Sequence, residues 1–317
     1  MRAPRQRPEP SLAVFGSLTI DDLVFPDGTT RWAVPGGSAV YAALGASLWT
    51  EYPSIVAPLG DDYPRDVLNG RIDLSRCTHL PRTLRNWGLY EEDGTRYFVS
   101  RSASRNWNEF CPMPEDAASG HQTAAHIAPA PHNIVADITR ELRKGGPLTI
   151  SLDLDDHDLA GQAKLDSIID LLRDIDLFLP SLHLARSLFG GTTALEVLHR
   201  IRSVAPDVAL IAVKCGAEGV IAHAVGTSEC VHVPAVPVEL VDPTGAGDAF
   251  CGGALASFMT EGNSVQALLS GTVSASFCVE GLGLAGLAAA TKDGADGRLS
   301  VLRRRASKSP FPDQPRD

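Results

Sequence analysis

The stretch from residue 241 to residue 253, V-D-P-T-G-A-G-D-A-F-C-G-G, decides the fold of this chain. It sets a glycine-rich turn at the start of an apolar helix. Glycine allows positive φ angles and a close approach of the backbone to a ligand, and the first amides of a helix have no partners within it. With the helix dipole behind them, the amides of Gly245, Ala246 and Gly247 can stabilise a phosphoryl group in transfer, while Asp248 accepts a proton from an attacking hydroxyl. The stretch therefore predicts phosphoryl transfer to an alcohol.

A lone G-x-G has an ordinary alternative, a strand-turn-helix corner in which Asp242 or Thr244 caps the helix and the glycines serve close packing. The aspartates on both sides of the glycines, followed by Phe250 and the glycine pair 252–253, are far more specific. The stretch resembles the second signature of the ribokinase-like (PfkB) family of carbohydrate and nucleoside kinases, D-T-x-G-A-G-D-x-F-x-G-G. Pro243 stands in place of the commoner threonine.

Two motifs near the N-terminus match the same family in the expected order. The segment G-S-L-T-I-D ends at Asp21, where relatives commonly have an aspartate that binds acceptor hydroxyls. The resemblance implies this role for Asp21, and a solvated loop pair with Asp22 is the alternative. Residues 35–45, P-G-G-S-A-V-Y-A-A-L-G, are similar to the first signature of the family. There Gly36 and Gly37 are implied to let backbone amides approach the acceptor.

Tyr41 departs from the first signature, because many sugar kinases have asparagine at this place. A phenol offers one hydroxyl and an apolar face where an amide both donates and accepts, so the change argues against ribose or fructose as acceptor. We expect Tyr41 either to contact the ring of the acceptor or to pack as a core tyrosine.

The nucleotide side is indicated by residues 213–219, V-K-C-G-A-E-G, which resemble the K-x-G-x-x-G turn of the family. The resemblance implies that Lys214 meets a phosphate and that Gly216 and Gly219 allow a close approach of the backbone, with Thr244 as a further nucleotide contact. A tight β-turn with an exposed lysine is the ordinary alternative. Relatives often use the aspartate equivalent to Asp242 to organise a monovalent cation.

One element of the family is missing, the N-x-x-E motif linked to magnesium and phosphate handling. Ser181 and Leu184 occupy the places of its amide and its carboxylate. Asp153, with the aspartates at 155 and 156, could hold water around Mg²⁺ or form a charged loop at the end of a strand. The resemblance implies ATP and Mg²⁺ as cofactors and leaves K⁺ open.

Composition narrows the class of protein. The 317 residues include 28 basic and 38 acidic side chains, a formal charge of −10, which argues against a nucleic-acid or membrane-surface binder. The six cysteines form no C-x-x-C pair, so reduced thiols in a cytosol are expected. Residues 1–10 lack the apolar core of a signal peptide, and no stretch reaches the roughly 18 apolar residues of a spanning helix. We expect a soluble, cytoplasmic protein.

From about residue 124 onward, apolar strands alternate with helical segments. This order predicts an α/β fold, a three-layer αβα sandwich with a mostly parallel central sheet, in which ligands gather at the carboxyl ends of the strands. Hairpin-like segments at about 22–34 and 82–105 interrupt the pattern. We expect them to form a small β lid over the site, with an extra structural hairpin as the alternative. The lid also offers a surface for a homodimer.

We therefore expect a kinase domain over residues 11–290, with flexible tails at 1–10 and 291–317. The interpretation is an ATP-dependent kinase that phosphorylates a hydroxyl, most naturally a primary one, of a sugar, nucleoside or cyclitol. Asp248 would be the general base and residues 245–247 the anion hole. The alternative is a non-catalytic PfkB-like ligand-binding or regulatory protein, suggested by Ser181 and Leu184 and opposed by the intact Asp248 loop.

Overall fold

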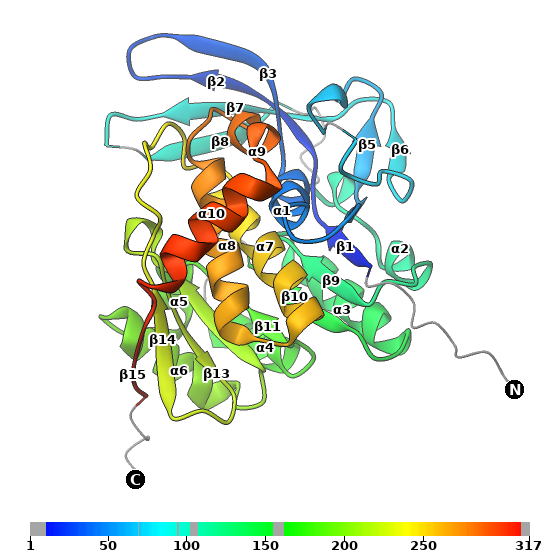
Figure 1. The fold of residues 1–317 in the computed structure, drawn as a ribbon. Helices are drawn as coiled ribbons and strands as arrows, with labels where there is room; N and C mark the ends of the chain where they lie inside the picture. Colours follow the sequence, from blue (N-terminus) through cyan, green and yellow to red (C-terminus); the bar gives the residue numbers. More distant parts are fainter. Residues whose placement is uncertain (1–10, 69, 94, 102–106, 155–161, 312–317) are drawn as a thin grey trace, which may run out of the picture.

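A nine-stranded sheet forms the centre of the described part of the computed structural model, which covers residues 11–68, 70–93, 95–101, 107–154 and 162–311 (Figure 1). Its strand order is β15-β14-β13-β12-β11-β10-β9-β1-β4. The neighbouring strands from β4 to β12 are parallel, and the pairs from β12 to β15 are antiparallel. The strands are β1 (Leu12–Phe15), β4 (Ser54–Val56), β9 (Ala124–Ile127), β10 (Thr149–Leu152), β11 (Leu177–Phe178), β12 (Leu210–Lys214), β13 (Val220–Ala224), β14 (Glu229–Val233) and β15 (Ser307–Pro310).

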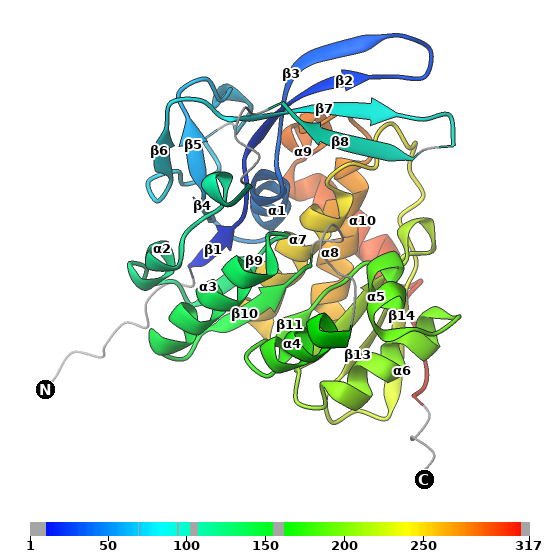
Figure 2. The same ribbon diagram turned by 180° about the vertical axis from the view of Figure 1, so that it is seen from behind.

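Helices cover both faces of this sheet. One face carries α1 (Ser38–Ala46), α7 (Ala246–Glu261), α8 (Ser264–Cys278), α9 (Ala285–Ala289) and α10 (Lys292–Arg303) (Figure 1). The other face carries α2 (Pro114–Ala118), α3 (His132–Lys144), α4 (Gln162–Leu172), α5 (Leu182–Phe189) and α6 (Ala194–Val204) (Figure 2). Strands covered on both sides are apolar throughout, as in β1, where all four residues are buried. The predicted sandwich with a mostly parallel sheet is confirmed.

A separate four-stranded sheet lies across one end of the sandwich, at the top of Figure 1, and we call it the lid. Its order is β3-β2-β7-β8, with two antiparallel hairpins joined by the parallel pair of β2 and β7. The strands are β2 (Thr19–Val24), β3 (Thr30–Gly36), β7 (Leu84–Tyr90) and β8 (Arg96–Ser100), and a smaller sheet pairs β5 (Pro58–Gly60) with β6 (Thr78–Leu80). The two segments expected to form the lid pair with each other through β2 and β7. Residues 102–105 of the expected lid lie outside the described residues.

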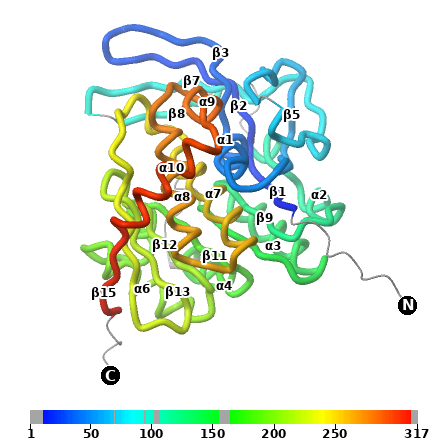
Figure 3. The backbone as a smooth tube through the Cα atoms, in the orientation of Figure 1, coloured from blue at the N-terminus to red at the C-terminus, as the bar shows by residue number. Residues whose placement is uncertain are grey.

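The C-terminal segment is ordered as far as residue 311, whereas the sequence interpretation took 291–317 as a flexible tail. Helix α10 starts at the cap residue Thr291 and buries Ala295 and Leu302 against the core. Strand β15, at the red end of the tube in Figure 3, then pairs with β14 along the edge of the sheet. The ring of Phe311 stacks on that of His223 with 3.8 Å between the ring centroids. The composition, rich in arginine and serine, concealed the few apolar positions that anchor this segment. Residues 1–10 and 312–317 lie outside the described residues.

Helices α1 and α7 are in backbone contact through small residues. A Cβ atom on Gly252 would lie 1.8 Å from the carbonyl oxygen of Ala42, and one on Gly45 would lie 2.3 Å from that of Ala249. Helix α7 is buried without interruption from residue 249 to residue 257, as expected for a helix apolar on all sides. The contact also places the ring of Tyr41, in the first turns of α1, against Gly245 at the start of α7.

Replacing Gly252 with alanine tests this contact. Because the added methyl group meets a backbone oxygen that has no room to move, we expect Gly252→Ala to lower the free energy of unfolding by about 1–3 kcal/mol, measured by urea denaturation. The matched control is Gly297→Ala in α10, where a Cβ atom meets nothing within 4 Å. That change should raise stability by about 0.5–1 kcal/mol. Equal effects of the two changes would contradict the contact.

Candidate active site

The glycine loop at the start of α7 is built as an anion site. Gly245 is the N-cap residue, has a φ angle of +77° in the left-handed region, and makes no side-chain cap bond. The capping alternative for Asp242 or Thr244 is therefore wrong. The first turn of a helix leaves its amides without intrahelical partners, and the dipole of α7 adds positive potential at this end. Among the backbone bonds of the described residues, the Ala246 amide bonds the Pro243 oxygen at 3.3 Å, while no such partner takes the amides of Gly247 and Asp248.

Asp248 stands in the first turn of α7 and is half-buried. Burial and, to a smaller extent, the neighbouring Asp153 carboxylate raise the pKa of its carboxyl, while Lys214 and the backbone amide of Asp248 lower it, and the net result is a pKa of about 7. A carboxyl with a pKa near neutrality combines a useful deprotonated fraction with enough basicity to accept a proton from an alcohol.

Lys214, at the end of β12, lies beneath this loop. Its ammonium forms an ion pair with Asp153, and these side chains are only 11% and 7% exposed. It also bonds Cys251 Sγ at 3.4 Å, and a Cβ on Gly247 would lie 3.2 Å from its Nζ. Burial opposes the charge of Lys214, but the carboxylate of Asp153 outweighs it and raises the pKa, so the lysine stays charged. The sequence predicts that Lys214 contacts a phosphate. In the structure its ammonium is directed at Asp153 instead.

The two glycines after Lys214 have different surroundings. Gly216 has a φ angle of +58° and open space where a Cβ would be, so its backbone is accessible to a ligand. At Gly219, with φ of +92°, a Cβ would lie 2.1 Å from the oxygen of Val233. Gly219 is therefore required by the packing of β14, and Gly216 is the better candidate for a nucleotide contact.

The residues expected to bind the acceptor alcohol are organised around Asp21 in β2. We call Asp21, Gly36 and Gly37 the acceptor group. Its carboxylate, 8% exposed, accepts hydrogen bonds from Asn86 Nδ2 at 2.9 Å and Thr19 Oγ1 at 3.1 Å. Burial raises its pKa to about 6, although these two bonds lower it. A Cβ on Gly36 would lie 2.7 Å from Asp21 Oδ2, and one on Gly37, with φ of +110°, would lie 2.3 Å from a backbone oxygen. The structure thus brings Asp21, Gly36 and Gly37 together.

Asp22 and Tyr41, which neighbour the acceptor group, make contacts elsewhere. Asp22 forms an ion pair with Arg101 and accepts a bond from the Ala33 amide at 2.8 Å, so its carboxylate is occupied elsewhere. Tyr41 is only 4% exposed, and its ring lies where a Cβ on Gly245 would come within 2.2 Å. The tyrosine therefore packs beneath the anion loop. Of the two alternatives for Tyr41, the structure shows the packing of a core tyrosine, with its ring in the space under Gly245.

Asp242 and Thr244, expected at a cation and at the nucleotide, are instead bound by the lid. Asp242 is 1% exposed, and its carboxylate accepts bonds from Tyr90 Oη at 3.2 and 3.3 Å, from the Thr244 amide at 3.0 Å and from the Gly283 amide at 3.2 Å. Thr244 Oγ1 bonds Tyr90 Oη at 2.9 Å and accepts from the Arg96 guanidinium at 2.8 Å.

A monovalent cation does not fit this arrangement. A carboxylate has about four lone-pair positions, and three donors, the Tyr90 hydroxyl and the amides of Thr244 and Gly283, already occupy most of those of Asp242. A guanidinium also lies next to the turn and would repel a second cation. Among the described residues, no group of three or more His, Cys, Asp or Glu side chains could hold a metal ion. Mg²⁺ is commonly held by phosphate oxygens with few protein ligands, so a kinase needs no protein cage for it.

The segment that replaces the N-x-x-E motif has a structural role. Ser181 caps α5 by accepting a bond from the Leu184 amide at 3.2 Å, and Leu184 is 3% exposed in the core. Asp153, considered above for water around Mg²⁺, is committed to Lys214, and residues 155 and 156 lie outside the described residues.

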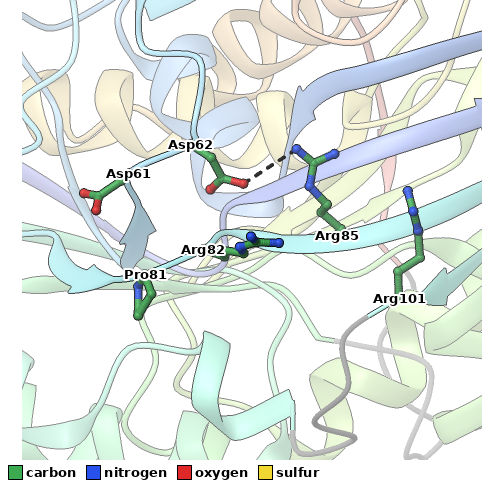
Figure 4. A pocket seen from close by; sticks show the side chains of 6 residues that line it. All are labelled: Asp61, Asp62, Pro81, Arg82, Arg85 and Arg101. Carbon is green, nitrogen blue, oxygen red and sulfur yellow. Dashed lines mark ion pairs between the residues drawn. The ribbon is translucent and has the colours of Figure 1, made fainter.

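A pocket of about 580 Å³ lies elsewhere, between the lid and the loops that follow β5 and β6 (Figure 4). Arg85 lines it and pairs with Asp62 at 3.6 Å. Asn86, the next residue of β7, bonds Asp21, and successive side chains of a strand point to opposite faces. The pocket is therefore on the other face of the lid from the acceptor group.

Comparisons with known proteins show the family of this chain. The model of the pfkB family carbohydrate kinases matches residues 10–290. A cytidine kinase of Thermococcus kodakarensis is 30% identical over 259 residues, covering 78% of this chain and 88% of the relative. A ribokinase of Arabidopsis thaliana, solved with ribose and ATP, superposes with a TM-score of 0.73 at 19% identity over 92% of this chain and 98% of its own.

A fructokinase double mutant of Vibrio cholerae, solved with fructose, ADP and potassium ion, has a TM-score of 0.73 at 17% identity and covers 91% of this chain and 98% of its own. This chain belongs to the PfkB family of carbohydrate kinases. It is a sugar or nucleoside kinase, a phosphotransferase with an alcohol group as acceptor. None of the described helices is long and apolar enough to cross a membrane.

The influence of Asp153 on the general base candidate is testable by pH dependence. Asp153→Asn removes a negative charge that raises the pKa of Asp248, while Lys214 still lowers it. The acid limb of kcat/KM reports the base of the free enzyme. We expect its midpoint near pH 7 in the native protein and about one unit lower in the variant. The control is Asp170→Asn, an exposed partner of Arg173; an unchanged midpoint in Asp153→Asn would contradict the coupling.

Proposed function

We propose that this PfkB kinase transfers the γ-phosphoryl group of ATP, with Mg²⁺, to a primary hydroxyl of a nucleoside. The observation that carries the proposal is Asp248, half-buried with a pKa near 7 and placed directly after the left-handed Gly245 loop. A proton acceptor and a set of unpartnered amides within one helical turn are what alcohol phosphorylation requires.

In the proposed mechanism, the acceptor hydroxyl lies against Asp248, which takes its proton as the oxygen attacks phosphorus. The amides of the Gly245–Gly247 loop and the dipole of α7 stabilise the negative charge of the transferring group. When bound, Mg²⁺ neutralises charge on the ATP phosphates. Asp21 and the turn at Gly36 and Gly37 hold the acceptor so that the attacking hydroxyl is close and aligned.

The nucleoside class is supported by two features. The cytidine kinase relative is 30% identical to this chain. In the first signature, Tyr41 removes the amide that many sugar kinases use and packs under the loop instead. Asn86, which bonds Asp21, brings an amide to the acceptor group from the lid. We propose that Asp21 and Asn86 together bind the ribose hydroxyls, with Gly216 on the nucleotide side.

The test replaces the base with an isosteric amide. Asp248→Asn retains the shape of the side chain but cannot accept the proton, so we expect kcat to fall about 100- to 10,000-fold with ATP binding preserved. ADP release is measured over a panel of nucleosides, pentoses, hexoses and cyclitols, with cytidine first, and calorimetry measures ATP binding.

The matched control is Asp137→Asn, on the exposed surface of α3. Full activity of Asp248→Asn would sink the assignment of the base. Binding of ATP and nucleosides by the native protein without ADP release from any acceptor would instead support the non-catalytic alternative. Release of ADP with pentoses but not with nucleosides would move the acceptor class to free sugars.

We further propose that a second copy of the chain covers the outer face of the lid. On that face Trp87 lies opposite Val99 and Leu89 opposite Tyr97, with Tyr97 and Val99 55% and 50% exposed. Contiguous exposed apolar side chains mark an interaction surface. We expect sedimentation to show a dimer that Val99→Glu dissociates; a native monomer at assay concentration would overturn this.

A further inference from the structure

The lid touches the catalytic loop through two side chains that the sequence motifs do not contain. Tyr90 ends β7 and Arg96 starts β8, and they face each other across the hairpin. The ring of Phe25 lies 4.9 Å from that of Tyr90 and holds it in place. The Tyr90 hydroxyl reaches Asp242 and Thr244, and the Arg96 guanidinium donates to Thr244 Oγ1 at 2.8 Å. These bonds join the hairpin of β7 and β8 to Thr244, the residue before Gly245.

The turn that receives these bonds carries a buried charge. Asp242 is 1% exposed, and within the described ranges no lysine, arginine or histidine forms an ion pair with it. Hydrogen bonds satisfy its oxygens, but a buried carboxylate also needs compensating positive potential. Arg96 is half-buried, and the hydroxyl of Thr244 links its guanidinium to the turn that contains Asp242. Its guanidinium cannot be deprotonated in a protein, so it supplies a permanent charge.

We propose that Arg96 is a positioning residue whose guanidinium supplies the positive charge beside Asp242, so that no bound monovalent cation is needed there. From the lid it compensates the charge of Asp242 and, through Thr244, fixes the turn that leads into the anion loop. The inference rests on the proposed kinase function, since the loop it positions is the one that binds the transferring group.

Two consequences follow from this arrangement. The kinase does not require K⁺, because donors and a guanidinium already occupy the surroundings of Asp242. The conformation of the anion loop also depends on the position of the lid, since Tyr90 and Arg96 belong to the same strands that bring Asn86 to the acceptor group. Binding of an acceptor under the lid and ordering of the catalytic loop are then one event.

The experiment compares Arg96→Ala with Arg31→Ala. Arg31 is a lid arginine on β3 that donates to the Thr30 oxygen and does not contact the loop. Initial rates are measured in tetramethylammonium chloride, in potassium chloride and with added guanidinium. We expect the native rate to be equal in the two chlorides. Arg96→Ala should lose about 10- to 100-fold in kcat, with the KM of the acceptor changed less than about threefold, and guanidinium should restore part of the loss.

A second measurement does not depend on turnover. Hydrogen exchange of the hydrogen-bonded amides of Thr244 and Ala246 should become about tenfold faster in Arg96→Ala and stay unchanged in Arg31→Ala, because only the former loosens the turn. If no acceptor gives ADP in any variant while this difference in exchange is found, the proposed kinase function fails and the role of Arg96 in positioning the loop stands.

The inference is overturned by any of three results. The first is a native rate that rises more than about fivefold on replacing tetramethylammonium with K⁺, which would show that a cation still acts there. The second is an Arg96→Ala protein whose kcat and loop exchange match those of Arg31→Ala. The third is a loss of kcat that guanidinium does not reverse, which would show a general structural defect.

Discussion

The site depends on the close approach of α1 and α7, whose backbones touch at Gly45 and Gly252. Without Cβ atoms at these positions, the two helices pack near enough for the ring of Tyr41 to lie directly beneath Gly245. The first turn of α1, which follows Gly37, is thereby in contact with the glycine loop that leads into α7, through the ring of Tyr41. In the proposed mechanism the acceptor and the phosphoryl group are bound at the starts of two helices whose separation is set by backbone contact, so small shifts of packing would move the reacting atoms apart.

An ion pair beneath the glycine loop balances the charges near Asp248. Beneath the loop, Asp153 holds Lys214 in an ion pair, and this pair keeps a positive charge near Gly247 while its carboxylate raises the pKa of Asp248. Because burial also raises that pKa, the base is near half-protonation at neutral pH. Lys214 alone would lower the pKa and weaken the base. The pairing therefore lets a cation lie under a phosphate site without weakening the carboxylate as a proton acceptor.

Sequence patterns predicted most of the fold because the central sheet is covered on both faces and its strands are short apolar runs between helices. The anion loop and Asp248 were also predictable, since both lie within one continuous motif. Asn86, Tyr90 and Arg96 were not, because each reaches the site through the pairing of β2 with β7, and the register of two strands 65 residues apart cannot be derived from composition. Tyr41 was left between a ligand contact and core packing, because the choice depends on the distance between two helices.

Joining the lid to the loop by side chains changes what the lid does. A lid that only covers its site excludes water and otherwise leaves the catalytic groups as they are. Here Tyr90 and Arg96 hold Asp242 and Thr244, and Asn86 holds Asp21, so one hairpin touches both Asp21 and the turn that precedes the glycine loop. Under the proposed function, an acceptor that fits under Asn86 favours the lid position in which Arg96 also reaches Thr244. Selectivity for the acceptor is then expressed in the rate of transfer as well as in binding, because a poorly fitting alcohol leaves the loop less well ordered.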